Sequence, residues 1–236
     1  MSRILPLCTW ICWQRKRVMN DRDMEEILPL LAEELKKREM PIVSQLAEGG
    51  RDPFTILIST LISLRTKDEV TAASTQRLFR LAGNPVDMLT LAPEAIAQAI
   101  YPAGFYRNKA RTILAVCREL VGRYNSHVPD SLEKLLELPG VGRKTANLVV
   151  TLGFNKEGIC VDTHVHRISN RLGYVRTKTP EQTEFALREK LPHKHWIDYN
   201  TLLVAFGRQT CRPISPLCSS CSIRAYCDRV GVKTSR

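Results

Sequence analysis

The chain has 236 residues, of which 44% are hydrophobic, so it can bury the core of one large domain or of two modest ones. Its formal net charge of +11 and isoelectric point near 9.5 favour a polyanionic partner, although a merely solvated basic surface is the alternative. No segment reaches the roughly 18 apolar residues needed to cross a bilayer. The apolar stretch 4–13 precedes its basic residues, which is the wrong order for a secretory signal and argues against a disulfide framework.

Apolar residues recur at helical spacing along most of the chain. The pair Asp52-Pro53 is a good helix start, with a buried strand as the competing interpretation of the β-branched stretch that follows. The pair Asn84-Pro85 is interpreted as a break. No alternating run demands a sheet, so the sequence predicts an all-α fold with helices at 23–38, 52–64, 67–81, 92–100, 109–124, 131–137, 143–152, 163–172, 180–190 and 196–207.

The segment LPGVGRKTA, residues 138–146, carries the clearest local motif. Gly140 and Gly142, separated only by Val141, predict a sharp hairpin between two helices, because glycine adopts backbone angles that a side chain resists. Val141 should fill the space between the helices. The amides of Val141, Gly142 and Arg143 should then point outward at a helix N-terminus, which suits a phosphate. An ordinary tight corner between helices is the alternative.

Lys144 follows in the first turn of the second helix, where the helix dipole and Arg143 disfavour a positive charge. A neutral amine is a nucleophile, so Lys144 is a candidate for covalent catalysis, with phosphate binding as the alternative. Further along, Asp162 begins the segment DTHVHR as either a simple N-cap or a carboxylate facing Lys144. His164 and His166 do not share a helix face and make a poor zinc pair.

Near the end of the chain, four cysteines follow the spacing C-x6-C-x2-C-x5-C. This spacing predicts a site for a metal ion or an iron–sulfur cluster. By ligand chemistry alone, four thiolates would bind zinc as well as an iron–sulfur cluster. The four candidate ligands are Cys211, Cys218, Cys221 and Cys227. Cys117 and Cys160 lie in apolar surroundings and are expected to be buried, inert thiols.

In this order and at this spacing, the hairpin, the VDTHVHR segment and the cysteine frame resemble the endonuclease III family of helix-hairpin-helix DNA glycosylases, over residues 23–230. The resemblance implies two helical domains with a DNA groove between them. One is a six-helix bundle at 46–156, and the other is a discontinuous domain of 21–45 and 157–236. Residues 1–20 would be a disordered arm or an extension, with a weak transit peptide as the alternative. The resemblance also favours a [4Fe-4S] cluster on the four cysteines.

The same resemblance implies a bifunctional DNA glycosylase and abasic-site lyase of base excision repair. Lys144 takes the place of the nucleophile and Asp162 that of the catalytic aspartate. The enzyme would remove oxidised pyrimidines from duplex DNA through a lysine Schiff base and nick the strand by β-elimination. Monofunctional relatives lack the lysine. The alternatives are a uracil- or mismatch-directed glycosylase of the same superfamily, or a non-catalytic DNA-binding module stapled by a metal. The expected partner is double-stranded DNA with damaged bases or abasic sites, bound by an intracellular monomer with no membrane contact.

Two positions qualify the resemblance. Arg65 stands where family members often carry a glutamine that fills the gap left by the flipped base, so Arg65 is expected to keep the wedge role with an altered opposite-base preference. Lys109 belongs to a loop that looks like a second backbone contact, with a surface lysine as the alternative. The residues expected to contact DNA are Arg65, Lys109, Gly140, Val141, Gly142, Arg143 and His164.

Overall fold

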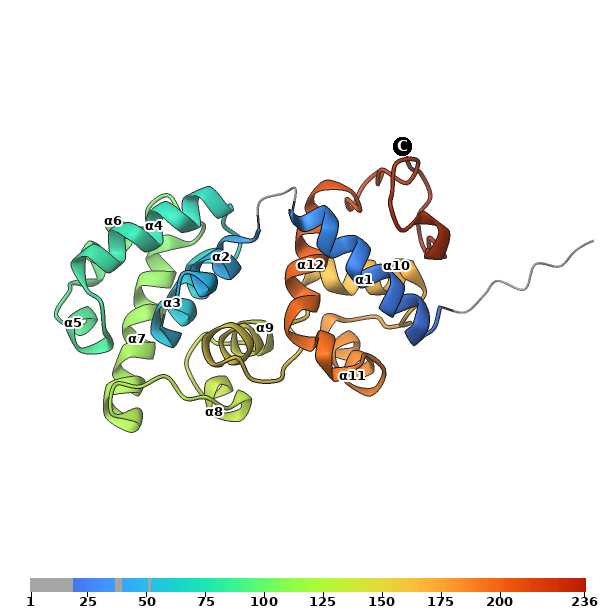
Figure 1. Cartoon of the computed structure of the whole chain (residues 1–236). Coiled ribbons are helices and arrows are strands. Elements are labelled where there is room, and N and C mark those ends of the chain that lie inside the picture. The colour runs from blue at the N-terminus through green and yellow to red at the C-terminus, as the bar shows by residue number, and fades with distance from the viewer. Residues whose placement is uncertain (1–18, 37–39, 51) are drawn as a thin grey trace, which may run out of the picture.

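The computed structural model describes residues 19–36, 40–50 and 52–236, and within them it contains helices and loops but no strand (Figure 1). The predicted all-α fold class is therefore confirmed. The α-helices are α1 (Asp21–Lys36), α2 (Ile42–Glu48), α3 (Pro53–Ser63), α4 (Asp68–Leu81), α5 (Pro85–Leu89), α6 (Pro93–Ile100), α7 (Tyr106–Tyr124), α8 (Leu132–Leu136), α9 (Arg143–Leu148), α10 (Thr163–Leu172), α11 (Pro180–Lys190) and α12 (Trp196–Gln209). A π-helical turn, η1 (Val149–Gly153), continues α9, and two 3-10 turns, η2 (His193–His195) and η3 (Arg224–Tyr226), complete the set.

The apolar stretch after Asp52 is the buried helix α3 and not the competing strand. The Asp52 carboxylate accepts hydrogen bonds from the backbone amides of Phe54, at 2.8 Å, and Thr55, at 3.1 Å. This satisfies amides that a helix start leaves without partners, and Pro53 has no amide proton to satisfy. This capping favours the helix, although the β-branched side chains of the segment are also common in strands.

Two short helices were not predicted. Helix α2 has seven residues and α5 has five, too few for a helical repeat of apolar positions to be recognised. The pair Asn84-Pro85, interpreted as a break, is the start of α5. The Asn84 side chain accepts a hydrogen bond from the Asp87 amide at 2.9 Å, and Pro85 takes the first helical position. Asparagine and proline are common both in loops and at helix starts, so the sequence alone did not separate the two cases.

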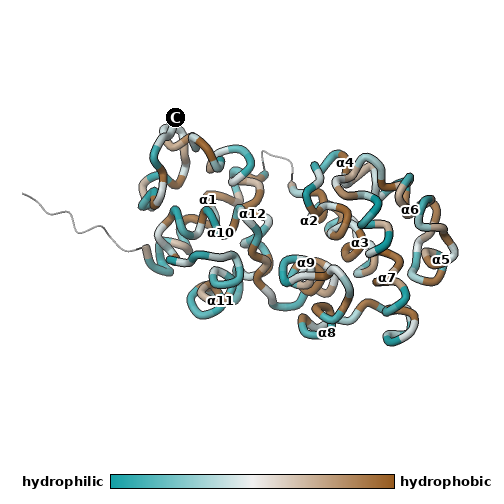
Figure 2. The backbone as a smooth tube through the Cα atoms, turned by 180° about the vertical axis from the view of Figure 1, so that it is seen from behind, coloured by the Kyte–Doolittle hydropathy of each residue, from teal (hydrophilic) through white to brown (hydrophobic). Residues whose placement is uncertain are grey.

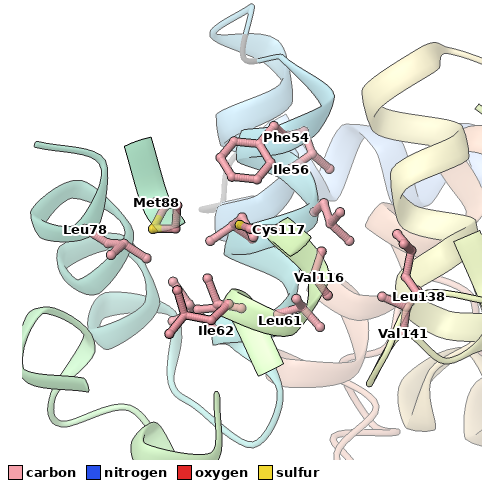
Figure 3. Packing of buried hydrophobic residues seen from close by; sticks show 14 of the residues in the cluster. Phe54, Ile56, Leu61, Ile62, Leu78, Met88, Val116, Cys117, Leu138 and Val141 are labelled. Atoms are coloured by element: carbon pink, nitrogen blue, oxygen red, sulfur yellow. The ribbon is translucent and has the colours of Figure 1, made fainter. Parts of the chain in front are cut away.

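Buried hydrophobic side chains form two separate clusters. The first extends from Val43 to Val150 and includes α3 and α7 at its centre (Figures 1 and 3). The second joins residues 19–31 to residues 159–223, so two distant parts of the chain build one core. In Figure 2, hydrophobic stretches run along α3 and α12, the central helices of the two halves. Two helical domains, one of them discontinuous, follow from this division.

We propose domain limits that differ slightly from those expected. Val43 of α2 packs in the first cluster, so that domain begins with α2 at Ile42 instead of at residue 46. Met19 is only 2% exposed and packs in the second cluster, so that domain reaches further towards the N-terminus than residue 21. Of the expected arm, residues 1–20, residues 1–18 lie outside the described residues.

Polar contacts join the two halves. The hydroxyls of Ser44 and Thr201 lie 3.0 Å apart, and Arg208 donates to the Asp68 carboxylate, with Nη2 to Oδ1 at 2.9 Å. Polar interfaces of this kind suit domains that enclose a wet groove more than domains that share one core. None of the described helices is long and apolar enough to cross a membrane.

Candidate active site

A pocket of about 220 Å³ opens where the two domains meet. Its walls come from the start of α2, the loop between α3 and α4, helix α9, the start of α10 and helix α12. The pocket therefore collects side chains that lie more than a hundred residues apart in the chain. The polar residues that line it include Arg65, Asp68, Lys144, Asp162, His164, Asn200 and Arg208. Four of the residues predicted from sequence, Arg65, Lys144, Asp162 and His164, are brought together here.

The hairpin before α9 is built as the sequence predicts. Gly140 has φ +73°, and a Cβ there would lie 2.6 Å from a methyl carbon of Thr112, so both backbone angle and space require glycine. Val141 is 6% exposed and packs with Leu138 in the first cluster (Figure 3). Gly142 is different, because nothing lies within 4 Å of a Cβ built on it. Its missing side chain leaves the backbone open to an external group.

Two amides of this hairpin, instead of the three that the sequence predicts, have no hydrogen-bond partner among the described residues. The Val141 amide donates to the Leu138 carbonyl at 3.1 Å, which corrects the prediction that it is free. The amides of Gly142 and Arg143 donate no hydrogen bond to any residue that the structure describes. These two amides, at the start of α9, remain available to an anion.

The Arg143 side chain is engaged inside the protein. Its Nε and Nη2 donate to the two carboxylate oxygens of Glu184 on α11, at 2.9 and 2.6 Å, and its guanidinium lies 4.9 Å from the centre of the Phe185 ring. Burial raises the pKa of Glu184, but the hydrogen bonds and charges of Arg143 and Arg188 lower it more, so its net pKa is below the usual value. Arg143 is thus a link between domains, and its positive charge beside Lys144 is balanced by Glu184.

Lys144 is half-buried and lines the pocket from the first turn of α9. Among the residues that the structure describes it forms no ion pair, so its amine is not committed to an internal carboxylate. Behind it, the Cys160 thiol lies 3.6 Å from the Lys144 carbonyl oxygen. Burial raises the pKa of Cys160 far above its usual value and also raises the pKa of Cys117, so both thiols are buried, as predicted, and stay protonated at neutral pH.

Asp162 caps α10 and also lines the pocket, so the structure shows both of the placements that the sequence left as alternatives. Its Oδ1 accepts hydrogen bonds from the amides of His164, at 2.8 Å, and Val165, at 2.9 Å, and so caps α10. Its Oδ2 accepts none from the described residues, and Asp162 lines the pocket together with Lys144. One oxygen holds the side chain in place while the other remains available for chemistry. Capping and catalysis are therefore compatible.

His164 is half-buried beside Asp162. Arg167 donates to its Nδ1 at 3.1 Å, and because a guanidinium only donates, the proton of the neutral ring lies on Nε2. Burial is the largest cause of a lowered pKa, which the Asp162 charge partly opposes. His164 is therefore a neutral side chain at the pocket wall near pH 7. Arg167 also donates to the carbonyl of Cys211 at 2.9 Å, and so connects α10 to the cysteine loop.

Arg65 is exposed on the loop between α3 and α4, with a left-handed φ of +53°. Its guanidinium lies 5.5 Å from the centre of the Phe105 ring. Phe105 also has a left-handed φ, +58°, and is 60% exposed, although a phenylalanine normally buries its ring. Phe105 was missed in the sequence, where only its position in the GFYRNK loop could have indicated it. Arg65 and Phe105 therefore form an exposed pair of loop tips, and Arg65 also lines the pocket.

Lys109 corrects a prediction. It was expected to reach a DNA phosphate, with a surface lysine as the alternative, but it is only 8% exposed. Its Nζ donates to the carbonyl oxygens of Ile62 and Leu64, both at 2.6 Å, and to Thr66 Oγ1 at 2.8 Å. Burial lowers its pKa to about 8. The sequence misled because a lysine on an amphipathic helix is usually solvated.

All four cysteines of the C-x6-C-x2-C-x5-C set line one small apolar pocket. Within the described residues, no group of three or more cysteine, histidine or carboxylate side chains is placed to hold a single metal ion. Four sulfur ligands on the walls of one apolar pocket are the kind of donor set that iron–sulfur clusters use. Burial raises the pKa of Cys227 to about 11, so positive metal charge is needed to hold it as a thiolate. Arg171 Nη1 lies 3.4 Å from Cys211 Sγ.

Comparison with known proteins gives a consistent set. The HhH-GPD superfamily of base excision DNA repair proteins matches residues 58–193. Endonuclease III of Thermotoga maritima is 50% identical over 177 residues, which are 75% of this chain and 83% of that protein. Endonuclease III homolog 2, chloroplastic, of Arabidopsis thaliana is 43% identical over 183 residues, and the chain spans 47% of its length. The solved structure of a trapped endonuclease III–DNA covalent intermediate superimposes with a TM-score of 0.80 at 34% identity, covering 89% of this chain and 97% of that one.

Proposed function

The chain belongs to the endonuclease III family of the HhH-GPD superfamily and is a DNA glycosylase and abasic-site lyase of base excision repair, and we propose that Lys144 and Asp162 carry its chemistry. The observation that carries this proposal is the pocket between the domains. Lys144, whose amine forms no ion pair among the described residues, and Asp162, whose Oδ2 accepts no hydrogen bond there, both line it. A non-catalytic DNA-binding module gives no reason for this pairing.

The reaction begins when the damaged nucleotide rotates out of the duplex into this pocket. Extrusion costs least for a damaged or poorly paired base, which is one source of selectivity. Lys144 Nζ then attacks C1′ of the deoxyribose, and the bond from C1′ to the base breaks. Asp162 Oδ2 accepts the proton that the amine loses, or stabilises the positive charge that develops on the sugar. The fixed cap at Oδ1 holds this carboxylate without reorganisation.

The sugar bound to Lys144 opens to a Schiff base, which is the step that distinguishes a lyase. Because the iminium withdraws electrons, a proton leaves C2′ and the bond to the 3′ phosphate breaks by β-elimination. Water then releases the product from Lys144. His164, a neutral ring at the pocket wall, is a candidate to hydrogen bond the bound strand. A monofunctional glycosylase needs no lysine here, so Lys144 favours the bifunctional reaction.

Duplex DNA would lie across both domains. The free amides of Gly142 and Arg143 would receive a phosphate, and the open space at Gly142 lets that phosphate approach the backbone. Arg65 would enter the gap left by the extruded nucleotide, next to Phe105. A monomer is sufficient for this arrangement, because the described chain supplies every wall of the pocket. Because its proposed substrate is duplex DNA, we expect the protein to be intracellular and associated with DNA.

We assign a [4Fe-4S] cluster to Cys211, Cys218, Cys221 and Cys227, supported by their common apolar pocket. When bound, the cluster would stiffen the loop that carries the exposed Arg212 and Arg224, which suit contact with phosphates. Arg167 and Arg171 hold this loop through the carbonyl oxygens of Cys211, Arg212 and Pro213. No step of the reaction depends on the cluster.

Oxidised pyrimidines are the proposed lesions. The second candidate is uracil or mismatch release, which Arg65 favours because arginine in place of glutamine prefers guanine edges. Duplexes carrying one thymine glycol or one uracil, each opposite guanine or adenine, separate the two. We expect the wild-type protein to release thymine glycol faster than uracil, and Lys144→Ala to release neither. Faster release of uracil opposite guanine would replace the first candidate by the second.

A further inference from the structure

The buried ammonium of Lys109 forms hydrogen bonds at the C-terminal end of α3. It donates to the carbonyl oxygens of Ile62 and Leu64, at the last turn of α3, where carbonyls have no partner within the helix. Its third donor reaches Thr66 Oγ1 on the following loop. A lysine with all three protons bonded is saturated, so Lys109 has no donor left for a phosphate.

Thr66 extends this contact to a second loop. Its hydroxyl accepts from Lys109 Nζ at 2.8 Å and from the Gly104 amide at 3.1 Å, and its own proton points to the Leu64 carbonyl at 3.3 Å. Gly104 lies so close that a Cβ there would be 2.5 Å from the Arg65 carbonyl oxygen. The Lys109 and Thr66 contacts therefore fasten the loop of Arg65 to the loop of Phe105.

Both exposed tips need such a support. Arg65 and Phe105 carry side chains but have φ of +53° and +58°, a conformation that persists only when the surroundings fix it. Their side chains meet in solvent, at 5.5 Å from guanidinium to ring centre, and so contribute little restraint of their own. The restraint comes from the hydrogen bonds of Lys109 and Thr66, which connect the backbone of the Arg65 loop to that of the Phe105 loop.

We propose that Lys109 is a positioning residue for strand separation: its buried ammonium sets the spacing of Arg65 and Phe105 so that they enter the duplex together as the nucleotide leaves. This inference rests on the proposed wedge role of Arg65. It assigns to Lys109 no contact with DNA and no part in the chemistry at Lys144. Its effect should therefore appear only when paired strands must be opened.

The test compares two abasic-site substrates under single-turnover conditions. In one the site lies in a fully paired duplex, and in the other it lies in a bubble of mismatched bases, where the strands are already open. The variants are Lys109→Met, Lys109→Arg, Thr66→Val, Arg65→Ala and the double variant Arg65→Ala with Lys109→Met. Abasic substrates need no base release, so an error in the proposed lesion range does not affect the result.

We expect Lys109→Met to cleave the paired duplex at least about tenfold more slowly than wild type, because displaced groups lose rate steeply, and to cleave the bubble within about twofold. Lys109→Arg, which keeps charge and donors, should recover part of the loss. In the Arg65→Ala background, Lys109→Met should add little, because the group that it positions is gone. Thr66→Val should show the same substrate dependence, and it decides the matter if Lys109→Met does not fold.

Equal losses on duplex and bubble, or additive losses in the double variant, would overturn the proposal and leave Lys109 a purely stabilising residue. Wild-type rates for Arg65→Ala on the duplex would refute the wedge assignment and with it this inference. A duplex-specific loss for Arg65→Ala but for neither Lys109→Met nor Thr66→Val would refute the positioning role alone.

Discussion

Replacing Glu184 by glutamine tests the buried link between the hairpin helix and the second domain. Glu184 is 3% exposed in its side chain and pairs with Arg143 and Arg188, which are 29% and 27% exposed. Removing one partner of a fully buried pair costs about 3–5 kcal/mol, and a hydrogen bond to a charged group about 1.5–3 kcal/mol. Because both guanidinium groups keep contact with water and glutamine keeps the shape, we expect Glu184→Gln to lower the free energy of unfolding by about 2–3 kcal/mol.

Urea unfolding followed by circular dichroism measures this change. The matched control is Glu189→Gln, the same substitution at an exposed position of the same helix, which should stay within about 0.5 kcal/mol of wild type. Equal effects of the two substitutions would refute the reasoning. The pKa of Glu184 is lowered in the folded state, so its contribution is present above the unfolded pKa and is lost as the pH falls through the folded one. The difference between wild type and Glu184→Gln should therefore shrink between about pH 5 and pH 3.

Three further changes test the other parts of the account. Asp162→Asn keeps the capping oxygen, so unfolding should change by less than about 1 kcal/mol while single-turnover base release falls at least about a hundredfold; a loss of stability with unchanged activity would reduce Asp162 to a cap. Gly140→Ala should lower the free energy of unfolding by about 1–3 kcal/mol, because of the positive φ at this position and the close contact with Thr112. Gly142→Ala should leave stability unchanged and weaken duplex binding, as measured by fluorescence anisotropy. The opposite pattern would contradict the roles assigned to the two glycines. Cys218→Ser should abolish bound iron and the visible absorption of the cluster and lower the Tm, and a wild-type protein that contains zinc instead of iron would argue against the cluster.

The hairpin could be predicted from the sequence because its determinants are local. A positive φ at Gly140, a buried apolar residue at Val141 and a helix start at Arg143 all follow within a few residues of one another. The same holds for α3, where Asp52 and Pro53 define the start. Local chemistry also placed Asp162 at the start of α10, as an N-cap.

What could not be predicted depends on contacts between distant segments. Nothing near Arg143 indicates that Glu184, 41 residues further on, neutralises it. Lys109 has the neighbours of a solvated lysine, and its burial arises because α7 crosses the end of α3, more than 40 residues earlier. A phenylalanine such as Phe105 is expected in the core, but in the folded chain its side chain is exposed. The pocket at the domain boundary likewise depends on tertiary contacts, so the sequence did not indicate Asp68, Asn200 or Arg208 as residues that line it.

The central claim is that Lys144 forms a Schiff base with the deoxyribose. The most direct measurement is to incubate the purified protein with a duplex that carries one thymine glycol, add borohydride, and look for a covalent protein–DNA band. The account predicts a band with the wild-type protein and none with Lys144→Ala, while that variant still binds the duplex. A band of equal strength from Lys144→Ala, or no band from the wild type even with an abasic-site duplex, would contradict it.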